Sequence, residues 1–566
     1  MSAWAAVCSR ESRVHSCVVF ISSKSFLDAK AKAFKQEAKD GMYELLLKSP
    51  KALYWGLPNY LREQGNFLRA WRENAERRDC SASAVLGALE AAYALNECAK
   101  SDESREEDIT GLASYAEEVV NSHQLENNPW NVLIAGVEIP AVLAGISPNN
   151  KVVRKLLKGA ASLLAESANV LFDEEGVVRA RHFGWYAAIV ATWTRCIAAS
   201  RRKQINLKLK KSFIATFEWT ARQLLLCSTG KRAISGLADG GEIKLAKPFI
   251  ALLLKLGGDL SDRRLASHMG YTQREFANPI EHHYLPDATL HSAESQVVVM
   301  RSGWDSKRCE LYIRYEQQDV YVDIVSAGVL LFRGNVASNL VVDGMSLSPL
   351  GAWEEVCWES DEDVEYLELE ISFSGGWKLQ KQFLLAKEEN LVLVGDVVLG
   401  DGRRGAIQLQ QAYRYGEGIS FYPSEDHAEG FLWSKDPVGM VLPLALPEWR
   451  VGTRCGSLTD KAGLLTYDVT AEEAAGLYAP LLMVLSGKAV TKDYTWRQLT
   501  VAEELNIQPA DVATGYRIQI GKKNWVLYRS LTEFGNRTLL GQNYSSEFAF
   551  GEFLEDGTVY EYVEIE

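Results

Sequence analysis

The sequence predicts an α+β multidomain protein in which an N-terminal (α/α) toroid is followed by a large antiparallel β-sandwich. The chain has 566 residues, and single hydrophobic cores stop growing at roughly 250–300 residues. Apolar residues recur at spacings of three and four before about residue 276 and alternate with period two after residue 295. We expect an N-terminal extension at 1–25, the toroid at 26–278, a linker at 279–294 and sandwich domains at 295–566.

The first half has the pattern of roughly ten amphipathic helices. Typical segments are "NNKVVRKLLKGAASLLAESANVLF" and "KKSFIATFEWTARQLLLC". Two segments, 129–146 and 183–199, are instead apolar nearly all round. Such helices are buried on every side, as the inner helices of a two-layer helical barrel are.

The second half consists of short runs rich in Val, Tyr, Trp, Leu and Ile, separated by Gly, Asp, Asn and Ser. Examples are "SQVVVMRSGW", "CELYIRYE" and "GYRIQIGKKNWVLYRSL". More than a dozen strands of this kind predict a large antiparallel sandwich. The segment "GDGRRG" at 400–405 has the letters of a dinucleotide fingerprint, but no helix follows it, so we expect a hairpin turn.

Composition and charge exclude several classes of protein. A formal net charge of −13 disfavours nucleic-acid binding. The nine cysteines are scattered singly, which indicates neither a zinc knuckle nor a disulfide framework. The N-terminal apolar run of five residues is shorter than a signal-peptide core of about 7–15 residues, and no segment approaches the roughly 18 continuous apolar residues of a membrane span. We expect a cytoplasmic protein without a membrane, metal or cofactor, or an exported one if the start is misassigned.

One polar constellation lies in "ENNPWNVLIAGVE". Asn127, Asn131 and Glu138 fall on roughly one face of an apolar helix. Asn127 or Asn128 is alternatively the N-cap of this helix, with Pro129 at its first position. A cap does not explain Glu138, because a carboxylate inside an apolar helix needs a partner or a cavity. Glu138 therefore lines a functional cleft or forms a structural ion pair.

A second constellation is "RARHFGWYAAIVATW", residues 179–193. Tyr186 begins the packed face of an apolar helix, and His182 continues this face one turn back. Tyr186 is either a core residue or a proton carrier facing a cavity, whereas His182 is expected in a pocket. Arg179 and Arg181 add positive charge that could bind a carboxylate.

Three further histidines, His282, His283 and His291, lie at the domain junction. A metal site is one interpretation, but no nearby set of Cys, His or Asp completes a coordination shell. We therefore interpret them as junction residues.

Taken together, these parts resemble a known family. A helical toroid with "NN…W…AG" and an "H-x-x-x-Y" helix, then "LPDA…VVVMRSGWD" and "WKLQKQFLLAKEENLVLVGDVV", resembles the heparinase II/III-like polysaccharide lyases over about residues 80–415. The resemblance implies β-elimination on a uronic-acid polymer. Asn128 or Asn127 would hold the carboxylate, Tyr186 would act as base or acid, and His182 or Arg181 would support it. The predicted substrate-binding residues are Asn127, Trp130, Asn131, Glu138, Arg179, Arg181, Trp185 and Gln318.

The chain departs from the family at one position. The family's sandwich presents an "H-x-H-x-D" turn, where this sequence has Glu316, Gln317, Gln318 and Asp319. Loss of these histidines implies a lyase that works with tyrosine alone, a changed reaction, or a scaffold without catalysis.

Three functions are compatible with these residues. The first is a lyase acting on an acidic oligosaccharide or polysaccharide in a cleft between toroid and sandwich. The second is a glycoside hydrolase that uses Glu138 with Glu126 or Asp173. The third is a catalytically inactive glycan-binding or scaffold protein, because a fold does not determine a function. The sequence leaves the glycan, its linkage, endo or exo action and the oligomeric state open.

Overall fold

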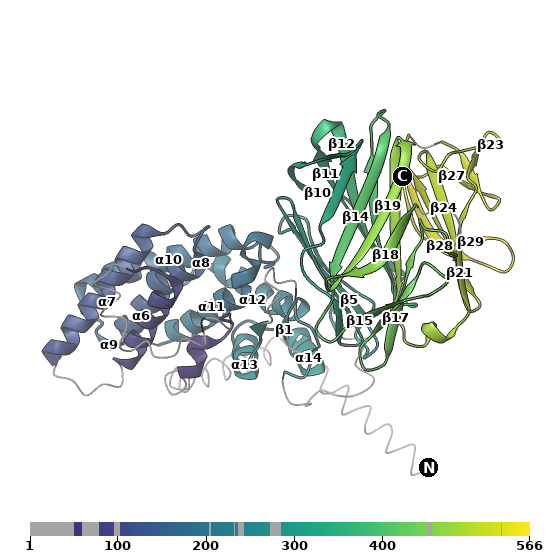
Figure 1. Ribbon diagram of the computed structural model, residues 1–566. Coiled ribbons are helices and arrows are strands. Elements are labelled where there is room, and N and C mark those ends of the chain that lie inside the picture. The colour runs from purple at the N-terminus through teal and green to yellow at the C-terminus, as the bar shows by residue number, and fades with distance from the viewer. Residues whose placement is uncertain are drawn as a thin grey trace, which may run out of the picture. The chain divides into compact units, whose positions relative to one another are not determined.

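A computed structural model describes residues 50–58, 61, 79–95, 102–202, 205, 207–230, 233–235, 243–271, 285–450, 455–533 and 535–566. The predicted extension at 1–25 and the first predicted helix, from Phe26, lie outside the described residues. Helices come first along the chain and antiparallel strands follow (Figure 1). The predicted fold class is thereby confirmed.

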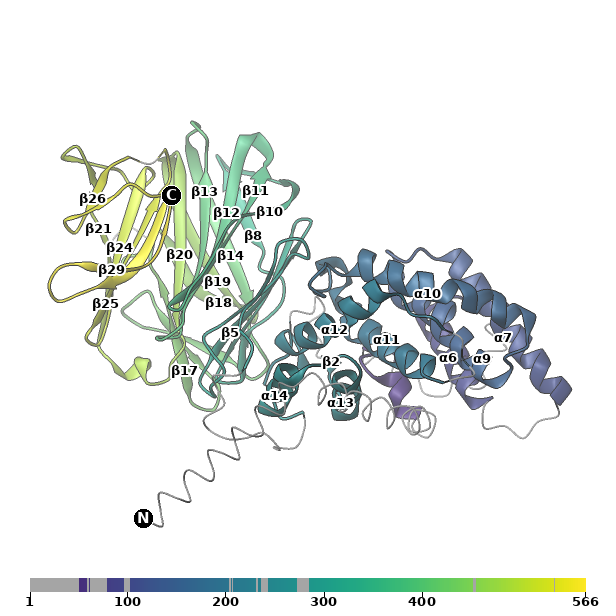
Figure 2. The same cartoon turned by 180° about the vertical axis from the view of Figure 1, so that it is seen from behind.

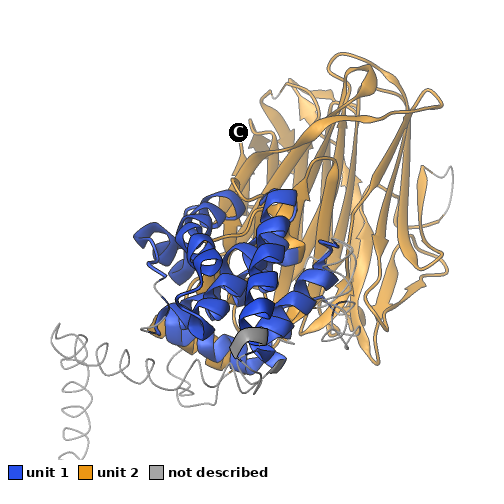
Figure 3. Ribbon diagram, turned by 90° about the vertical axis from the view of Figure 1, so that its left-hand side faces the viewer, with its two compact units in different colours: residues 1–174, 185–219, 246–258 blue, residues 175–184, 220–245, 259–566 orange. Residues whose placement is uncertain are grey.

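The chain divides into two compact units that interleave along the sequence (Figure 3). The first comprises residues 1–174, 185–219 and 246–258, and the second comprises 175–184, 220–245 and 259–566.

This division differs from the single predicted boundary at 279–294. Short segments of the helical half join the strands because they hydrogen-bond to them. For example, the Ala180 amide donates to the Ser295 carbonyl at 2.8 Å. The predicted linker also contains part of the sandwich, since β3 (Leu290–Ser292) pairs with β4 (Val297–Arg301).

The first unit is helical, and the last residues of α12 belong to the second unit. Its helical elements are η1 (Pro50–Tyr54), α6 (Ala82–Ala94), α7 (Asp102–Ser122), α8 (Pro129–Leu133), η3 (Ile134–Glu138), α9 (Ile139–Ile146), α10 (Lys151–Leu171), α11 (Tyr186–Ser200), α12 (Lys211–Leu226) and α13 (Lys247–Leu256). The second unit adds η4 (Ala180–Trp185), most of which belongs to it, and α14 (Leu260–His268).

The elements α8, η3 and α9 form one continuous apolar segment, Pro129–Ile146. The Ile139 amide donates to the carbonyl of Ile134, five residues back, which makes η3 a π-turn. Pro140 follows at once and has no amide hydrogen to donate. Among the described residues, this is the one segment with the length and composition of a membrane span, and 89% of it is buried. It is a core helix of its unit, as its all-round apolar pattern predicts.

Close packing around this segment requires one glycine. A Cβ atom on Gly136 would lie 2.4 Å from Cδ2 of Leu163 in α10 and 3.2 Å from Cγ2 of Val120 in α7. A larger residue would therefore push apart three helices of the first unit.

The strands of the second unit form sheets in which the paired strands are antiparallel (Figures 1 and 2). The eight-stranded sheet has the order β10 (Pro349–Ser360), β11 (Val364–Phe373), β12 (Trp377–Ala386), β13 (Leu391–Leu399), β20 (Gly476–Val484), β17 (Pro437–Pro443), β16 (Gly430–Trp433), β15 (Ser420–Pro423). A five-stranded sheet has the order β18 (Gly456–Lys461), β19 (Leu464–Ala474), β14 (Gly405–Arg414), β8 (Ser338–Val342), β9 (Met345–Ser346).

Four further groups of strands complete the unit. The first of these is the sheet that contains β3 and β4, followed in order by β5 (Cys309–Glu316), β6 (Asp319–Ser326) and β7 (Val329–Phe332). A C-terminal sheet contains β21 (Tyr494–Leu499), β24 (Ala513–Ile520), β25 (Lys523–Ser530), β28 (Phe548–Phe553) and β29 (Val559–Ile565). The remaining strands are β22 (Ala502–Glu503), β23 (Asn506–Ile507), β26 (Arg537–Leu539), β27 (Gln542–Tyr544), and the pair β1 (Ala233–Ile234) and β2 (Ile243–Lys244).

The central strands β12, β13 and β20 of the eight-stranded sheet are buried on both faces, so the sandwich has three layers. On one face, Lys381 in β12 donates to Ser338 in β8 at 2.9 Å. On the other face, Gln380 in β12 accepts from Arg529 in β25 at 2.5 Å. Successive residues of a strand point to opposite faces. The sheet therefore lies between the sheet of β8 and the sheet of β25.

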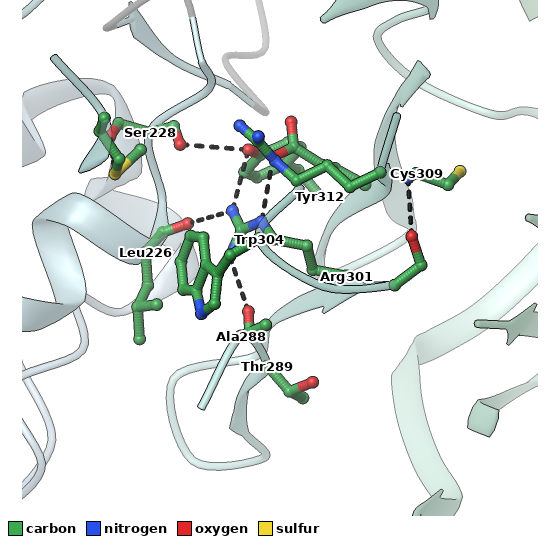
Figure 4. Close-up of polar contacts among 12 residues, drawn as sticks. Leu226, Ser228, Ala288, Thr289, Arg301, Trp304, Cys309 and Tyr312 are labelled. Atoms are coloured by element: carbon green, nitrogen blue, oxygen red, sulfur yellow. Dashed lines mark hydrogen bonds and ion pairs between the residues drawn. The ribbon is translucent and has the colours of Figure 1, made fainter. Parts of the chain in front are cut away.

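The "RSGWD" motif at 301–305 joins the end of α12 to the first sheet (Figure 4). Arg301 Nε donates to Glu310 Oε1 at 3.0 Å, and its Nη2 donates to the Tyr312 hydroxyl at 3.1 Å and to the Leu226 carbonyl at 2.9 Å. Its Nη1 donates to the Ala288 carbonyl at 2.6 Å. The guanidinium is fully buried, so these contacts replace its lost hydration.

The neighbouring residues of the motif also have structural partners. The Trp304 ring lies 4.7 Å from the Arg301 guanidinium, and its Nε1 donates to the Pro286 carbonyl at 2.9 Å. Ser302 accepts from the Cys309 amide at 2.9 Å. The motif that carries the family resemblance thus specifies the fold.

Removal of the Arg301 charge is expected to destabilise the second unit. Arg301→Leu leaves Glu310 and two carbonyls with fewer partners, and breaking a buried ion pair costs about 3–5 kcal/mol. The exposed Arg497 supplies the control, because Arg497→Leu should change the free energy of unfolding by less than about 0.5 kcal/mol. Urea unfolding measures both. A loss below about 1 kcal/mol for Arg301→Leu would contradict this assignment.

Candidate functional site

A pocket of about 200 Å³ lies in the first unit, where three helices begin. Its wall comes from the start of α6, the residue after α7, the start of α8 and the residue before α11. The lining residues are Cys80, Ser81, Ala82, His123, Asn128, Trp130, Asn131 and Trp185. None of them is Asp, Glu, Lys or Arg, so the pocket is polar without a formally charged carboxylate, ammonium or guanidinium group.

Asn128 occupies the N-cap position of α8, but its side chain does not cap the helix. By contrast, the N-cap Asn150 of α10 accepts from the amides of Val152 and Val153 at 3.0 and 3.2 Å. Within the described part of the chain, the Asn128 side-chain amide forms no hydrogen bond. Asn128 therefore occupies the N-cap position that the sequence predicts. Its side-chain amide does not cap the helix and is available to a ligand.

Two tryptophan rings stack at this pocket. The Trp130 and Trp185 ring centroids are 5.5 Å apart and their planes differ by 5°. Trp130 is buried and Trp185 is half-buried. Small-molecule sites typically combine aromatic walls with a few well-placed polar groups. Trp130 and Trp185, both predicted to bind substrate, line a pocket of this kind.

Three helices, α6, α8 and α11, begin at the pocket. The start of a helix carries a partial positive charge that favours an anion. Ser81 caps α6 by accepting from the Ala84 amide at 3.4 Å, whereas neither Asn128 nor Trp185 makes a side-chain cap. No lysine or arginine lines the pocket.

The other two predicted amide contacts differ in position. Asn131 lines the pocket, and its Nδ2 donates to the Cys80 carbonyl at 3.0 Å, which joins the starts of α8 and α6. Asn127 is exposed, and its Nδ2 donates to Gln124 Oε1 at 3.1 Å. Asn127 does not line the pocket.

Tyr186 is packed in the core of the first unit. It is fully buried, and its ring meets that of Phe172 edge-on with centroids 5.9 Å apart. It is not among the residues that line the pocket. These surroundings are those of a core tyrosine, which is one of the two predicted interpretations. The role of Tyr186 as base or acid stays a prediction.

His182, Arg179 and Arg181 belong to the second unit. Arg181 Nε donates to His182 Nε2 at 3.0 Å, which places the proton of the neutral imidazole on Nδ1. Burial, together with the charges of Arg181 and Arg179, lowers the pKa of His182 to about 4. Arg179 forms an ion pair with Glu294 at 2.6 Å. None of the three lines the pocket, so these residues do not supply the positive charge expected there.

Glu138 forms a buried ion pair. Arg195 Nε and Nη2 donate to its two carboxylate oxygens at 2.6 and 2.9 Å, and the Tyr93 hydroxyl donates at 2.9 Å. Both charged side chains are almost completely buried. The structural ion pair, one of the two predicted alternatives, is the one observed. The hydrolase hypothesis thereby loses its free carboxylic acid at Glu138.

The predicted sandwich-side residues have structural contacts. Gln318 lies in the β5–β6 turn, where its Nε2 donates to the Pro349 carbonyl at 3.2 Å. His291 stacks on Trp358 with ring centroids 4.4 Å apart and lies 2.9 Å from Glu355 Oε1. His282 and His283 lie outside the described residues. In the described ranges, no three His, Cys, Asp or Glu residues are grouped as metal ligands.

Sequence reasoning missed four pocket residues: Cys80, Ser81, Ala82 and His123. A signal for His123 exists in the polar stretch "NSHQLENN" between two helices, where a histidine stands five residues before Asn128. A signal for the partner of Glu138 also exists, because Arg195 is a lone charge in an apolar helix. Two lone opposite charges in buried helices predict a pair.

The shifted pKa of His182 predicts a pH-dependent stability. The pKa is about 4 in the folded protein and 6.5 for a free histidine, so the unfolded chain binds this proton more tightly. The stabilisation is present above pH 6.5 and is lost as the pH falls towards 4. His182→Gln keeps an acceptor for Arg181 but does not titrate. As the pH falls from 6.5 to about 4, the free energy of unfolding of wild type should fall, relative to that of His182→Gln, by on the order of 3 kcal/mol. Parallel pH profiles would contradict this.

The comparisons with known proteins concern the fold. No protein-family model and no curated protein sequence matches this chain. Among solved structures, a heparinase III (BT4657 gene product) has a TM-score of 0.57 at 11% identity, covering 82% of this chain and 83% of its own. Heparan sulfate lyase HepC from Pedobacter heparinus has 0.55 at 12%, covering 83% and 82%. A further heparinase III has 0.60 at 10%, covering 82% and 79%. The chain shares with these proteins the fold of a helical toroid followed by a β-sandwich.

Proposed function

We propose that this chain is a polysaccharide or oligosaccharide lyase that cleaves a uronic-acid-containing glycan by β-elimination. The observation that carries the proposal is the uncommitted side-chain amide of Asn128 in a pocket lined by the stacked Trp130 and Trp185. The amide and the helix termini would bind the uronate carboxylate, and the indole pair would supply an apolar wall for a sugar ring.

The chemistry explains why an amide is useful at this position. Abstraction of the C5 proton of a uronate places negative charge on the carboxylate, so donors already aimed at the carboxylate stabilise the transition state. The electrons of the C5–H bond then form a C4–C5 double bond as the C4–O bond breaks. A neutral amide and helix dipoles would stabilise this negative charge without forming a strong ion pair with the carboxylate. Such an ion pair would slow release of the product.

The structural neighbours support the same class of reaction. Proteins described as heparinase III and as heparan sulfate lyase share the fold at 10–12% identity. The names of these proteins refer to heparin and heparan sulfate, which are acidic glycans, and we propose an acidic glycan as the partner of this chain.

A catalytically inactive glycan-binding protein is the second candidate. It is favoured by the β5–β6 turn, which has Gln317 and Gln318 in place of histidines. The hydrolase alternative has less support, because Arg195 holds the Glu138 carboxylate by two hydrogen bonds.

The test is a panel of uronate-containing glycans followed by the ultraviolet absorbance of the unsaturated product. Wild type is expected to form this product, and Asn128→Ala should lower kcat by about 10²–10³, as loss of one donor to a developing anion does. Gln124→Ala is the matched control. Gln124 is exposed in the same loop and does not line the pocket, so its variant should stay within twofold of wild type.

Other results would assign a different function. New reducing ends without ultraviolet absorbance would indicate a hydrolase. Binding without turnover of any glycan, with affinity lowered by Asn128→Ala, would indicate the inactive binding protein. Equal turnover by wild type and Asn128→Ala would remove Asn128 from the site.

A further inference from the structure

We propose that His123 is the catalytic base of this pocket, an inference that rests on the proposed lyase function. Of the residues that line the pocket, Cys80 and His123 have titratable side chains. Imidazole is the commonest general base in enzymes. His123 lies directly after the last residue of α7, in the polar stretch that leads to Asn128.

Hydrogen bonding assigns the tautomer of this imidazole. His123 Nδ1 lies 3.1 Å from the carbonyl oxygen of Val119 and 3.1 Å from Ser122 Oγ. A carbonyl only accepts, so Nδ1 carries the hydrogen and Nε2 carries a lone pair. Across the described ranges, no hydrogen bond reaches Nε2. The backbone therefore holds the ring with its basic nitrogen unoccupied.

The other two predicted proton carriers are less well placed. Tyr186 is fully buried against Phe172 and does not line the pocket. His182 Nε2 already accepts from Arg181. His123 and Asn128, in contrast, line the same hollow and come from one short loop between α7 and α8. A base and a carboxylate binder are thus brought together within the first unit.

The proposed β-elimination at His123 transfers one proton, forms one double bond and breaks one C–O bond. Nε2 takes the C5 proton of the uronate, the C–H electron pair becomes the C4–C5 double bond, and the C4–O bond breaks with its electrons on the leaving oxygen. The leaving oxygen takes a proton from solvent, and the imidazolium returns its proton to solvent. No oxidant, reductant or net proton is consumed.

The experiment uses the full chain and the glycan that wild type cleaves best. His123→Asn keeps a donor for the Val119 carbonyl but has no basic nitrogen. We expect kcat to fall by about 10²–10⁴ with KM within about threefold. In His123→Ala, added imidazole should restore turnover in a concentration-dependent way, but it should not do so in Asn128→Ala. Gln124→Ala, at the exposed residue directly after His123 that does not line the pocket, is the matched control and should stay within threefold.

The outcomes separate the two proposals. If wild type forms no unsaturated product, both fail. If wild type is active and His123→Asn keeps its kcat, only the assignment of His123 fails. If kcat falls while imidazole does not rescue His123→Ala and the unfolding midpoint drops, the role of His123 is structural and the assignment also fails. Loss of activity in Cys80→Ala, with His123→Asn active, would transfer the role to the thiol.

Discussion

The buried ion pair between Arg195 and Glu138 is the contact on which the arrangement of the first unit depends. It joins α11 to the π-turn η3, and it also receives the Tyr93 hydroxyl from α6 and reaches the Ala52 carbonyl at the N-terminal side. Two buried charges that satisfy each other tolerate little displacement, because an unpaired one would be very costly. The helices joined by the pair also lie next to the pocket, because Trp130 belongs to α8 and Trp185 directly precedes α11.

The pocket obtains its polarity from amides, hydroxyls and helix ends. This suits a site that must stabilise a charge appearing during reaction, since fixed dipoles need no reorganisation at that moment. Asn128 illustrates the consequence for stability. An asparagine side chain that caps a helix contributes about 0.5–2 kcal/mol, and Asn128 makes no such bond. Residues that lack a stabilising local contact of this kind are characteristic of functional sites. His123 is held by the chain through Nδ1, and its other nitrogen has no hydrogen-bond partner among the residues that the structure describes.

Sequence reasoning was accurate where a repeating pattern determines burial. The helix Pro129–Ile146 and the helix from Tyr186 are buried as their apolar composition predicts. It was less accurate where distant segments meet. The two compact units divide the chain differently from the predicted boundary at 279–294, and within the second unit Arg301 binds the Leu226 carbonyl at the end of α12. The "RSGWD" segment was recognised as a motif, but its buried guanidinium shows that it organises the fold.

The sequence by itself determined the order of helices and strands, the burial of the two apolar helices and the position of Asn128 at a helix start. These features follow from local periodicity and from the preference for Pro129 in a first turn. Tertiary structure alone decided that His123 shares a pocket with Asn128, that Tyr186 packs inside, and that Arg195 pairs with Glu138. The reason is physical, because the direction of a side chain is set by its own helix, whereas its partners come from packing between segments far apart in sequence.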